Sequence, residues 1–296
     1  MFINRTSSFS KIKYAPTSVV FPVSDTKRHF ITFGGNSKNS GETNRSLVET
    51  LVKPHGVLVK HPINYHNAVC RICNQASLFR LFDTITGCTE RFLQQDSEFW
   101  EKHREFIESN SRGYGYWIWK PYIIKKQLEK MNENDVLVYV DSGCEMNVLG
   151  VQRLYEYMAK TAETDTGILG FIHRNLYEKE WTKMDVFAKM DAYEFADTTQ
   201  ISANALFIRK CSASVEIINE WYDTCCDYSV INDTPSTIPN DPAFQEHRHD
   251  QSILSILLKK HKCLLLYDET FLPQDIRWSF PIWGLRNRDG VSLIYK

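Results

Sequence analysis

The 296-residue chain lacks features that would place it in several large classes of protein. It has no apolar run near the roughly 18 residues that cross a bilayer. Its short apolar stretch at 18–23 contains a proline and is followed by charged residues, which does not fit a signal peptide. It also has no excess of one charge, because 35 Lys and Arg oppose 36 Asp and Glu for a net charge of −1. We therefore expect a cytoplasmic protein without a membrane span, and without a nucleic-acid partner bound by broad phosphate neutralisation.

A second cysteine pair that would complete a zinc site is also missing. Cys70 and Cys73 form a C-x-x-C, but the remaining cysteines offer no matching pair at the spacing of zinc ligands. In a cytoplasmic protein the eight cysteines are expected to be free thiols. Cys70 and Cys73 lie in a segment with helical spacing, so we interpret them as small buried residues on one helix face.

The chain is rich in aromatic residues, which make up 13% of it. From residue 29 onward, strand and helix patterns alternate, which predicts an α/β fold with a mostly parallel sheet flanked by helices. Strands are predicted at 29–33, 83–87, 136–140, 166–172, 201–208 and 263–267, and helices at 65–81, 92–108, 121–131, 151–162, 181–190, 215–226 and 250–261. Residues 1–28 show no period and are predicted to form an irregular arm.

The strand predicted at 136–140 leads into the first candidate for chemistry. It is apolar on both faces, as expected of a central strand covered by helices on both sides. Asp141 follows it directly, at the edge where ligands bind in open α/β sheets. A carboxylate there can hold a cation, or Asp141, Ser142 and Gly143 can simply form a turn.

Two further segments carry residues suited to binding. Five aromatic rings crowd into the nine positions 114–122, beside Arg112 and Lys120. They can pack as ordinary core, or form a platform for a base next to cations that suit a diphosphate. The second segment is His-Arg-His-Asp-Gln-Ser at 247–252. Asp250 can be the N-cap of the helix that follows, or the cluster can bind a metal or an anion.

Together these motifs resemble the GT-A-type glycosyltransferases, specifically a group found in polysaccharide gene clusters and in large DNA viruses. The resemblance covers about 29–267, with an insertion at about 36–64. It rests on five segments, at 29–34, 112–121, 139–145, 180–183 and 247–252. It implies one GT-A, Rossmann-like domain over 29–296, with a nucleotide-sugar-binding half at 29–145 and an acceptor-binding half at 146–296.

The resemblance implies transfer of a sugar from a nucleoside-diphosphate donor, expected to be a UDP-sugar, to a hydroxyl of a glycan or glycoprotein acceptor. The donor-binding residues that it implies are Thr32, Phe33, Gly34, Arg112, Tyr116, Trp119, Lys120, Asp141, Ser142 and Lys183. It also implies a divalent cation, Mn²⁺ or Mg²⁺, that neutralises the leaving diphosphate as a Lewis acid. Asp141 matches the first aspartate of the D-x-D motif, but the second is Gly143, so a further ligand would come from Glu145 or His249.

The resemblance also points to catalytic residues. Asp250 and Gln251 resemble the D-Q pair that many retaining members place near the donor sugar. An inverting enzyme needs instead a carboxylate base that deprotonates the acceptor, and Asp250 could be that base. Two other functions fit the same residues: a non-catalytic GT-A-like protein that binds a nucleotide or glycan, and a metal-dependent phosphohydrolase that uses Asp141 and the histidine cluster.

Overall fold

A computed structural model describes residues 26–35, 48–52, 57–61 and 64–295. The irregular arm predicted at 1–28 lies outside these residues up to residue 25, and Arg28 already belongs to the first strand. Within the segment interpreted as an insertion, β2 (Val48–Val52) and β3 (Val57–His61) form an antiparallel hairpin.

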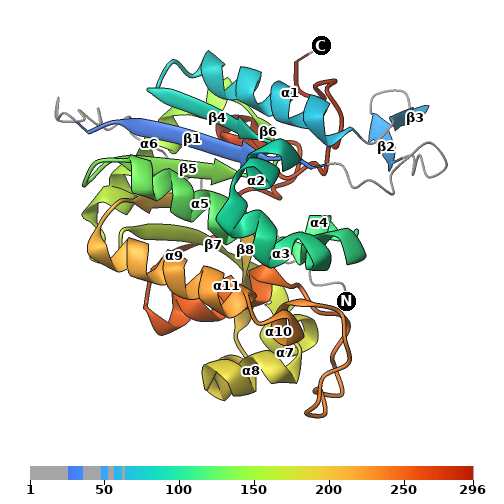
Figure 1. Ribbon diagram of the computed structural model, residues 1–296. Helices are drawn as coiled ribbons and strands as arrows, with labels where there is room; N and C mark the ends of the chain where they lie inside the picture. The colour runs from blue at the N-terminus through green and yellow to red at the C-terminus, as the bar shows by residue number, and fades with distance from the viewer. Residues whose placement is uncertain (1–25, 36–47, 53–56, 62–63, 296) are drawn as a thin grey trace, which may run out of the picture.

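A six-stranded mixed sheet forms the centre of the molecule, in the order β4-β1-β5-β8-β7-β9 (Figure 1). Its strands are β1 (Arg28–Phe33), β4 (Thr84–Cys88), β5 (Val136–Val140), β7 (Ile168–Tyr177), β8 (Thr199–Arg209) and β9 (Leu264–Tyr267). Neighbouring strands are parallel except at β8, which is antiparallel to both β5 and β7. The predicted α/β fold, a single domain with a mostly parallel sheet flanked by helices, is confirmed.

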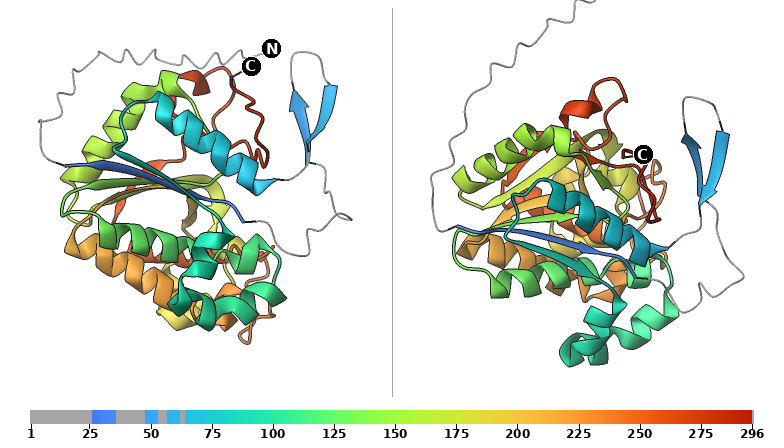
Figure 2. Two further views of the ribbon diagram at one scale, coloured as in Figure 1. Left: turned by 45° about the horizontal axis from the view of Figure 1, so that its top comes forward. Right: turned by 90° about the horizontal axis from the view of Figure 1, so that it is seen from above.

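Helices cover both faces of the sheet (Figure 2). The α-helices are α1 (Tyr65–Leu78), α2 (Glu90–Gln95), α3 (Ser97–Ser109), α4 (Gly113–Tyr116), α5 (Trp119–Lys130), α6 (Val151–Glu163), α7 (Glu178–Trp181), α8 (Met184–Met190), α9 (Ser212–Cys225), α10 (Tyr228–Ile231) and α11 (Asp250–Lys260). Helices α1 and α6 pack on one face, and α3, α5, α9 and α11 on the other. Strand β5 serves both layers, because Tyr139 packs on the α5 side and Val138 and Val140 on the α1 side.

Local side-chain chemistry explains where the helices differ from prediction. The single helix predicted at 92–108 is two helices, because Asp96 caps α3 by accepting a hydrogen bond from the N–H of Phe99. The single helix predicted at 181–190 is also two, α7 and α8, with Thr182 and Lys183 between them in extended conformation. Helix α5 begins at Trp119, two residues before the proline at which the sequence predicted its start.

The chain after β9 returns to the sheet with little regular structure, and the sequence predicted no element there. A short β10 (Ile282–Trp283) pairs with β6 (Glu145–Met146), just after β5. The segment then runs beside α1, as the red and cyan ribbons show in Figure 2. This return brings residues 284–289 next to the turn that follows β5.

Two further sequence predictions are tested by the fold. Within the described residues, no helix combines the length and apolarity that crossing a bilayer requires. All eight cysteines lie within the described residues and are free thiols, as predicted. Cys70 and Cys73 lie on α1, but Cys70 is exposed. The prediction that both are buried is wrong, because Ile72 and Ala76 occupy the face of α1 that packs on the sheet.

Candidate functional site

Three of the predicted site residues meet at the carboxyl end of β5. Lys120, in the first turn of α5, is only 3% exposed, and its Nζ lies 3.3 Å from Asp141 Oδ1 and 3.1 Å from Asp250 Oδ2. The same ammonium donates to the carbonyl oxygen of Ala203 at 3.1 Å. A lysine ammonium has three protons, and three oxygen atoms surround this one. Lys120 therefore joins the two carboxylates inside the protein rather than facing solvent.

Asp141 has one oxygen fixed by the protein and one open. Tyr139 Oη donates to Oδ1 at 2.5 Å, the oxygen that also lies next to Lys120. The N–H of Asp141 donates to the carbonyl oxygen of Asn204 at 2.8 Å, which fixes the backbone. The side chain is 33% exposed, and no described residue donates a hydrogen bond to Oδ2. Asp141 thus presents an oriented acceptor to a ligand at the edge of the sheet.

Strand β8 departs from regular pairing beside Asp141. Leu169 of β7 pairs with Phe207, but Phe171 pairs with Ser202, so residues 203–206 face a single residue of β7. Irregularities of this kind redirect side chains and are common next to active sites. Here the irregular stretch contains Asn204 and the carbonyl of Ala203 that contacts Lys120.

Asn204 is a candidate binding residue that the sequence analysis missed. Its Oδ1 is buried and accepts no hydrogen bond, while its Nδ2 donates to Thr270 Oγ1 at 2.8 Å. A buried amide oxygen without a donor is uncommon and calls for an explanation such as a bound ligand. The signal was an asparagine inside the mostly apolar strand predicted at 201–208.

Gln251, predicted to be catalytic beside Asp250, is bound to β8. Its Oε1 accepts from the N–H of Ala203 at 3.1 Å, and its Nε2 donates to Gln200 Oε1 at 2.7 Å. Both ends of the amide are used to hold α11 against β8. In this structure Gln251 is a positioning residue, because it fixes Ala203, whose carbonyl contacts Lys120.

Burial and charge shift the pKa values of the central group. Burial raises the pKa of Asp250 to about 6, although Lys120 opposes the rise. Burial by itself would lower the pKa of Lys120, but Asp141 and Asp250 outweigh it and raise that pKa above its ordinary value. Lys120 is therefore a permanent cation, whereas Asp250 exchanges its proton near pH 6.

The raised pKa of Asp250 predicts how stability depends on pH. Its pKa is about 3.9 in an unfolded chain and about 6 when folded, so the folded state binds the proton more tightly. The resulting stabilisation is complete below about pH 4 and is lost as the pH rises through 6; it amounts to at most about 3 kcal/mol. Denaturant unfolding from pH 4 to pH 7 should show wild-type stability falling relative to Asp250→Asn. A difference that does not change with pH would contradict this.

The residues expected to contact the base at the end of β1 are buried. Thr32 and Phe33 lie in the core, and the Trp119 ring stacks on Phe33 with ring centres 4.0 Å apart. Gly34 is buried against α1, where a Cβ would lie 2.7 Å from the carbonyl oxygen of Tyr65. In this conformation these residues do not reach a ligand. The interpretation of Trp119 as part of a ring platform is therefore corrected to core packing.

The segment between α3 and α5 forms a left-handed turn, which the sequence analysis did not predict. All five residues from Gly113 to Trp117 have positive φ, between 52° and 82°. The N–H groups of Tyr116 and Trp117 donate to carbonyl oxygens four residues earlier, so this is a left-handed helical turn, labelled α4 in Figure 1. Residues other than glycine pay about 1–2 kcal/mol each for this conformation. Such strain gathers at functional sites.

This turn packs its partly exposed rings against the histidine motif. The Tyr116 and Trp117 rings lie 4.8 and 5.3 Å from the ring of His249. His249 has a strained backbone of its own, with φ 55° and ψ −123°, immediately before α11 begins. The two strained segments therefore contact each other at His249, the residue immediately before Asp250.

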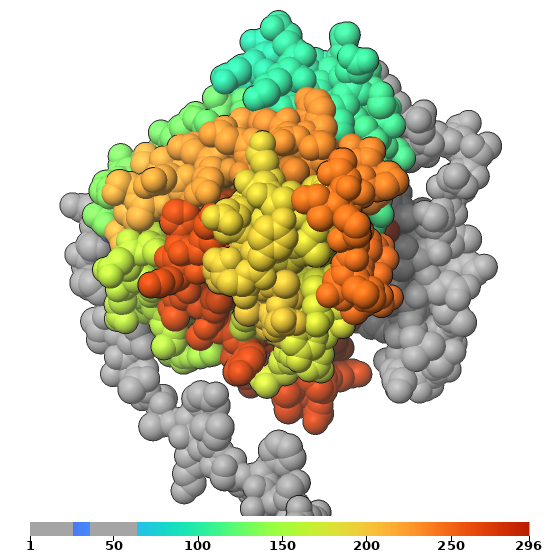
Figure 3. Space-filling view, turned by 90° about the horizontal axis from the view of Figure 1, so that it is seen from below, coloured from blue at the N-terminus to red at the C-terminus, as the bar shows by residue number. Residues whose placement is uncertain are grey.

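Arg112 holds a surface segment rather than lying at the central group. Its guanidinium forms ion pairs with Asp233 at 2.9 Å and with Glu246 at 3.3 Å. Both carboxylates belong to the segment 232–249, drawn in orange in Figure 3, where it lies beside the yellow α7 and α8. Because Arg112 precedes the left-handed turn, these ion pairs join the turn to that segment.

Lys183 is bound by the same segment. Its buried Nζ donates to the carbonyl oxygens of Asn232 at 3.1 Å and Thr234 at 3.4 Å, and burial lowers its pKa. His247 lies beside it, accepting from the N–H of Lys183 and donating from Nε2 to the carbonyl of Val230. Lys183 therefore positions the segment 232–249 and offers no free donor to a sugar.

Glu145 is an anchor for the C-terminal segment. It is fully buried. Its two oxygens accept hydrogen bonds from Gln75 Nε2, Asn287 Nδ2, Ser292 Oγ and the N–H of Leu293. Ser142 is buried nearby, and its carbonyl accepts from Arg71 at 2.7 Å. Glu145 therefore has no oxygen left for a ligand beside Asp141.

The residues expected to hold a divalent cation do not assemble into a metal site. The oxygens of Glu145 are already used, and His249 donates from Nδ1 to the carbonyl of Ile231 at 2.8 Å. Across the part of the chain that the structure describes, no group of three or more His, Cys, Asp or Glu could hold a metal ion. The donor set does not fit a cation bound by Asp141, Glu145 and His249. The use of Mn²⁺ or Mg²⁺ stays a prediction.

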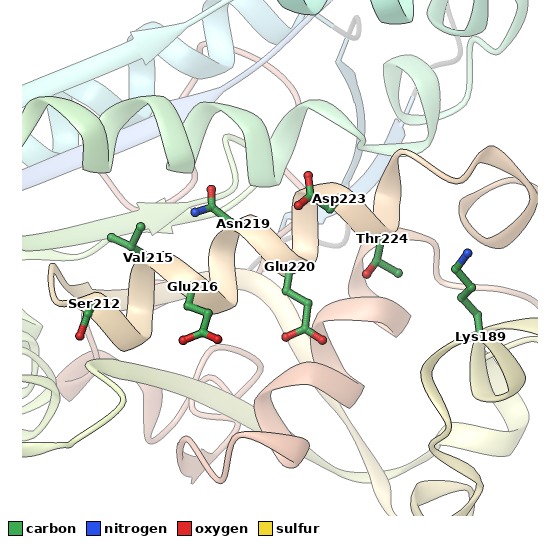
Figure 4. Close-up of a pocket in the computed structure, with 8 residues that line it drawn as sticks. All are labelled: Lys189, Ser212, Val215, Glu216, Asn219, Glu220, Asp223 and Thr224. Carbon is green, nitrogen blue, oxygen red and sulfur yellow. The ribbon is translucent and has the colours of Figure 1, made fainter.

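A shallow hollow of about 810 Å³ lies on the surface away from this group (Figure 4). It is lined by Ser212, Val215, Glu216, Asn219, Glu220, Asp223 and Thr224 of α9, with Lys189 of α8 opposite. None of the predicted site residues lines it. Its acidic side chains, Glu216, Glu220 and Asp223, indicate no particular ligand, and we do not assign one.

Comparison with known proteins finds distant likenesses in structure. No protein-family model matches the chain, and no curated protein matches it in sequence. Mouse xyloside xylosyltransferase 1, in its apo form, is similar in structure with a TM-score of 0.40 and 13% identity, over 84% of this chain and 89% of that one. A putative glucose-1-phosphate thymidylyltransferase from Bacillus anthracis, in complex with a sucrose, has a TM-score of 0.36 and 9% identity, over 81% and 87%. These likenesses concern the fold and carry no argument about activity.

Proposed function

We propose that this protein transfers a sugar from a nucleoside-diphosphate donor, with UDP the expected nucleotide, to a hydroxyl group of a glycan or glycoprotein. The observation that carries the proposal is the group of Lys120, Asp141 and Asp250 at the carboxyl end of β5. Ligands of open α/β sheets bind at this edge. The GT-A-type glycosyltransferases that the sequence resembles have their acidic motif in the corresponding place.

In this proposal Asp141 contacts the donor, and its neighbours prepare it to do so. Tyr139 and Lys120 hold Oδ1, which leaves Oδ2 to accept hydrogen bonds from hydroxyl groups of the donor. Because these partners are buried and fixed before a ligand arrives, little reorganisation is needed on binding. Asp250 is the second carboxylate of the site, with a proton that exchanges near pH 6.

Replacing Asp141 with alanine should reduce sugar transfer at least about a hundredfold, the usual effect of removing one fixed polar group that contacts the reacting ligand. Turnover of UDP-sugars with a panel of glycan acceptors measures it, and circular dichroism checks that the variant is folded. Asp197→Ala is the matched control, because that side chain is 83% exposed and, among the described residues, its ion pair is with Lys179 on the surface. Undiminished transfer by Asp141→Ala would contradict the proposal.

A second candidate function is a non-catalytic protein that binds a nucleotide or a glycan. It is favoured by Gly143 at the second acidic position of the motif and by the predicted metal ligands that do not assemble. Titration calorimetry with UDP and UDP-sugars, together with an assay for donor hydrolysis and transfer, separates the two. Binding of the nucleotide without any turnover would favour this second candidate over an enzyme.

A further inference from the structure

We infer that Arg286 and Arg288, on the C-terminal segment, form a binding site for the diphosphate group of a nucleoside diphosphate. The inference rests on the proposed function, because it places the donor beside Asp141. It adds residues that no sequence motif indicated. It also assigns the neutralisation of the diphosphate to arginine side chains, because the residues expected to bind a divalent cation do not assemble into a metal site.

The first observation is where the segment lies. The N–H of Asn287 donates to the carbonyl oxygen of Gly143 at 2.8 Å. A Cβ on Gly143 would lie 3.7 Å from the Cα of Arg286. The C-terminal segment therefore runs along the turn that begins at Asp141, at the edge of the sheet where a ligand is expected.

The second observation is that two buried charged residues anchor the segment. Glu145 accepts from Asn287 Nδ2 at 2.7 Å, and Arg71 donates to the carbonyl oxygens of Asn287 and Asp289, both at 2.8 Å. Asn287 and Asp289 are buried as a result, whereas Arg286 is exposed and Arg288 half-buried. The anchors thus turn residues 287 and 289 inward and leave both arginines outward.

The third observation is that both arginines lack a countercharge. Among the described residues, neither Arg286 nor Arg288 forms an ion pair or a side-chain hydrogen bond. Burial lowers the pKa of Arg248, Glu246 raises it, and Arg286 lowers it further. The effect of Arg286 indicates that it lies near Arg248. Because Arg286 is exposed and has no acidic partner among the described residues, its charge is open to an anion.

The second arginine lies near Asp141 through a shared neighbour. Burial raises the pKa of Tyr65, and Arg288 and Asp141 act on the same group in opposite directions. Tyr65 is the first residue of α1, which packs on the face of the sheet opposite α5. Arg286 and Arg288 therefore both lie near the turn after β5, Arg286 close to Gly143 and Arg248, and Arg288 close to Tyr65 at the start of α1.

The chemistry of the group selects a diphosphate. A diphosphate carries two or more negative charges, and Lys120 is already used by two carboxylates and a carbonyl. Arg248 is likewise paired with Glu246 at 2.9 Å. A guanidinium presents a planar fork of donors that fits phosphate oxygens in pairs. Two such forks beside Asp141 match the two phosphate groups of the donor, with the sugar reaching Asp141.

The test is titration calorimetry of the full chain in EDTA, with UDP, UMP and inorganic pyrophosphate as ligands. The wild type should bind UDP and pyrophosphate, and UMP at least about tenfold more weakly, because one phosphate is missing. Arg286→Ala and Arg288→Ala should each weaken UDP binding about tenfold, and the double variant more than either, while UMP changes less. Arg104→Ala is the control, because Arg104 is exposed on α3, away from the site.

Each result bears on the inference separately from the proposed function. Both arginines lie outside the core, so the variants should fold, and thermal unfolding checks this. UDP binding in EDTA that is lost in the variants supports the inference even if no sugar transfer is found. Transfer that depends on Asp141 while both arginine variants bind UDP normally would overturn it. So would a failure of the wild type to bind UDP and pyrophosphate, or binding that requires Mn²⁺ and survives the double substitution.

Discussion

Replacing Lys120 with methionine should lower the free energy of unfolding by about 3–5 kcal/mol, the usual cost of removing one partner from a buried ion pair. The substitution keeps the length of the side chain but leaves Asp141 Oδ1 and Asp250 Oδ2 without the ammonium that lies 3.3 and 3.1 Å away. Asp250 is buried and would keep its charge only at a further cost. Denaturant unfolding near pH 7.5 measures the loss.

The matched control for this prediction lies on the same helix. Lys126 also contacts two carboxylates, Asp96 at 3.8 Å and Glu129 at 3.3 Å, but near the surface. Lys126→Met should cost at most about 1 kcal/mol, as exposed ion pairs do. Combining Lys120→Met with Asp250→Asn should recover part of the loss, which a double-mutant cycle reports as coupling between the two residues. Equal losses for the two lysine variants would show that burial of the charge has no special effect here.

Replacing Gly113 with alanine should destabilise the protein by about 2–5 kcal/mol, by adding left-handed backbone strain to an overpacked contact. Gly113 has a φ of 57°, and a Cβ there would lie 2.3 Å from the Trp117 ring. The ring would have to move, and with it the contact between Trp117 and His249 in front of Asp250. Denaturant unfolding measures the energy, and near-ultraviolet circular dichroism reports the displaced tryptophan.

Gly143→Ala is the control for this prediction. Gly143 does not have a left-handed backbone, and the Cα of Arg286 at 3.7 Å is the one heavy atom near its would-be Cβ. The free energy of unfolding should therefore change by no more than about 0.5 kcal/mol, as at positions without a special constraint. If Gly113→Ala were as mild as Gly143→Ala, the left-handed turn would not be a fixed feature of the native state.

The fold could be predicted largely because its signals are local. Apolar runs such as 136–140 and helical spacing such as that of 65–81 depend on residues close together in the chain, and they predicted β5 and α1 within a few residues. The break between α2 and α3 was missed because a single cap, Asp96, decided it. The left-handed turn was missed because five consecutive residues with positive φ are contrary to every local preference except that of glycine.

The candidate site could be predicted only in part. Asp141, Lys120 and Asp250 were all named from sequence motifs, and the structure brings them within hydrogen-bonding distance. Glu145 was predicted to bind a metal and Lys183 to bind the donor. The structure does not place them for these roles, because each is bound by a segment distant in the sequence. Charge and residue type suggested ligands, but burial and hydrogen-bond partners decided which groups stay open.

The sequence by itself determined the alternation of strands and helices, the apolar central strand and the acidic residue at its end, because these follow from the periodicity and order of residues along the chain. The tertiary structure alone decided which side chains use up their hydrogen-bonding capacity inside the protein. It placed a lysine between two carboxylates, and it returned residues 286–289 to the turn after β5. The contacts of Lys120 with Asp250 and of Asn287 with Gly143 join positions more than a hundred residues apart, and no local pattern encodes the distance between them.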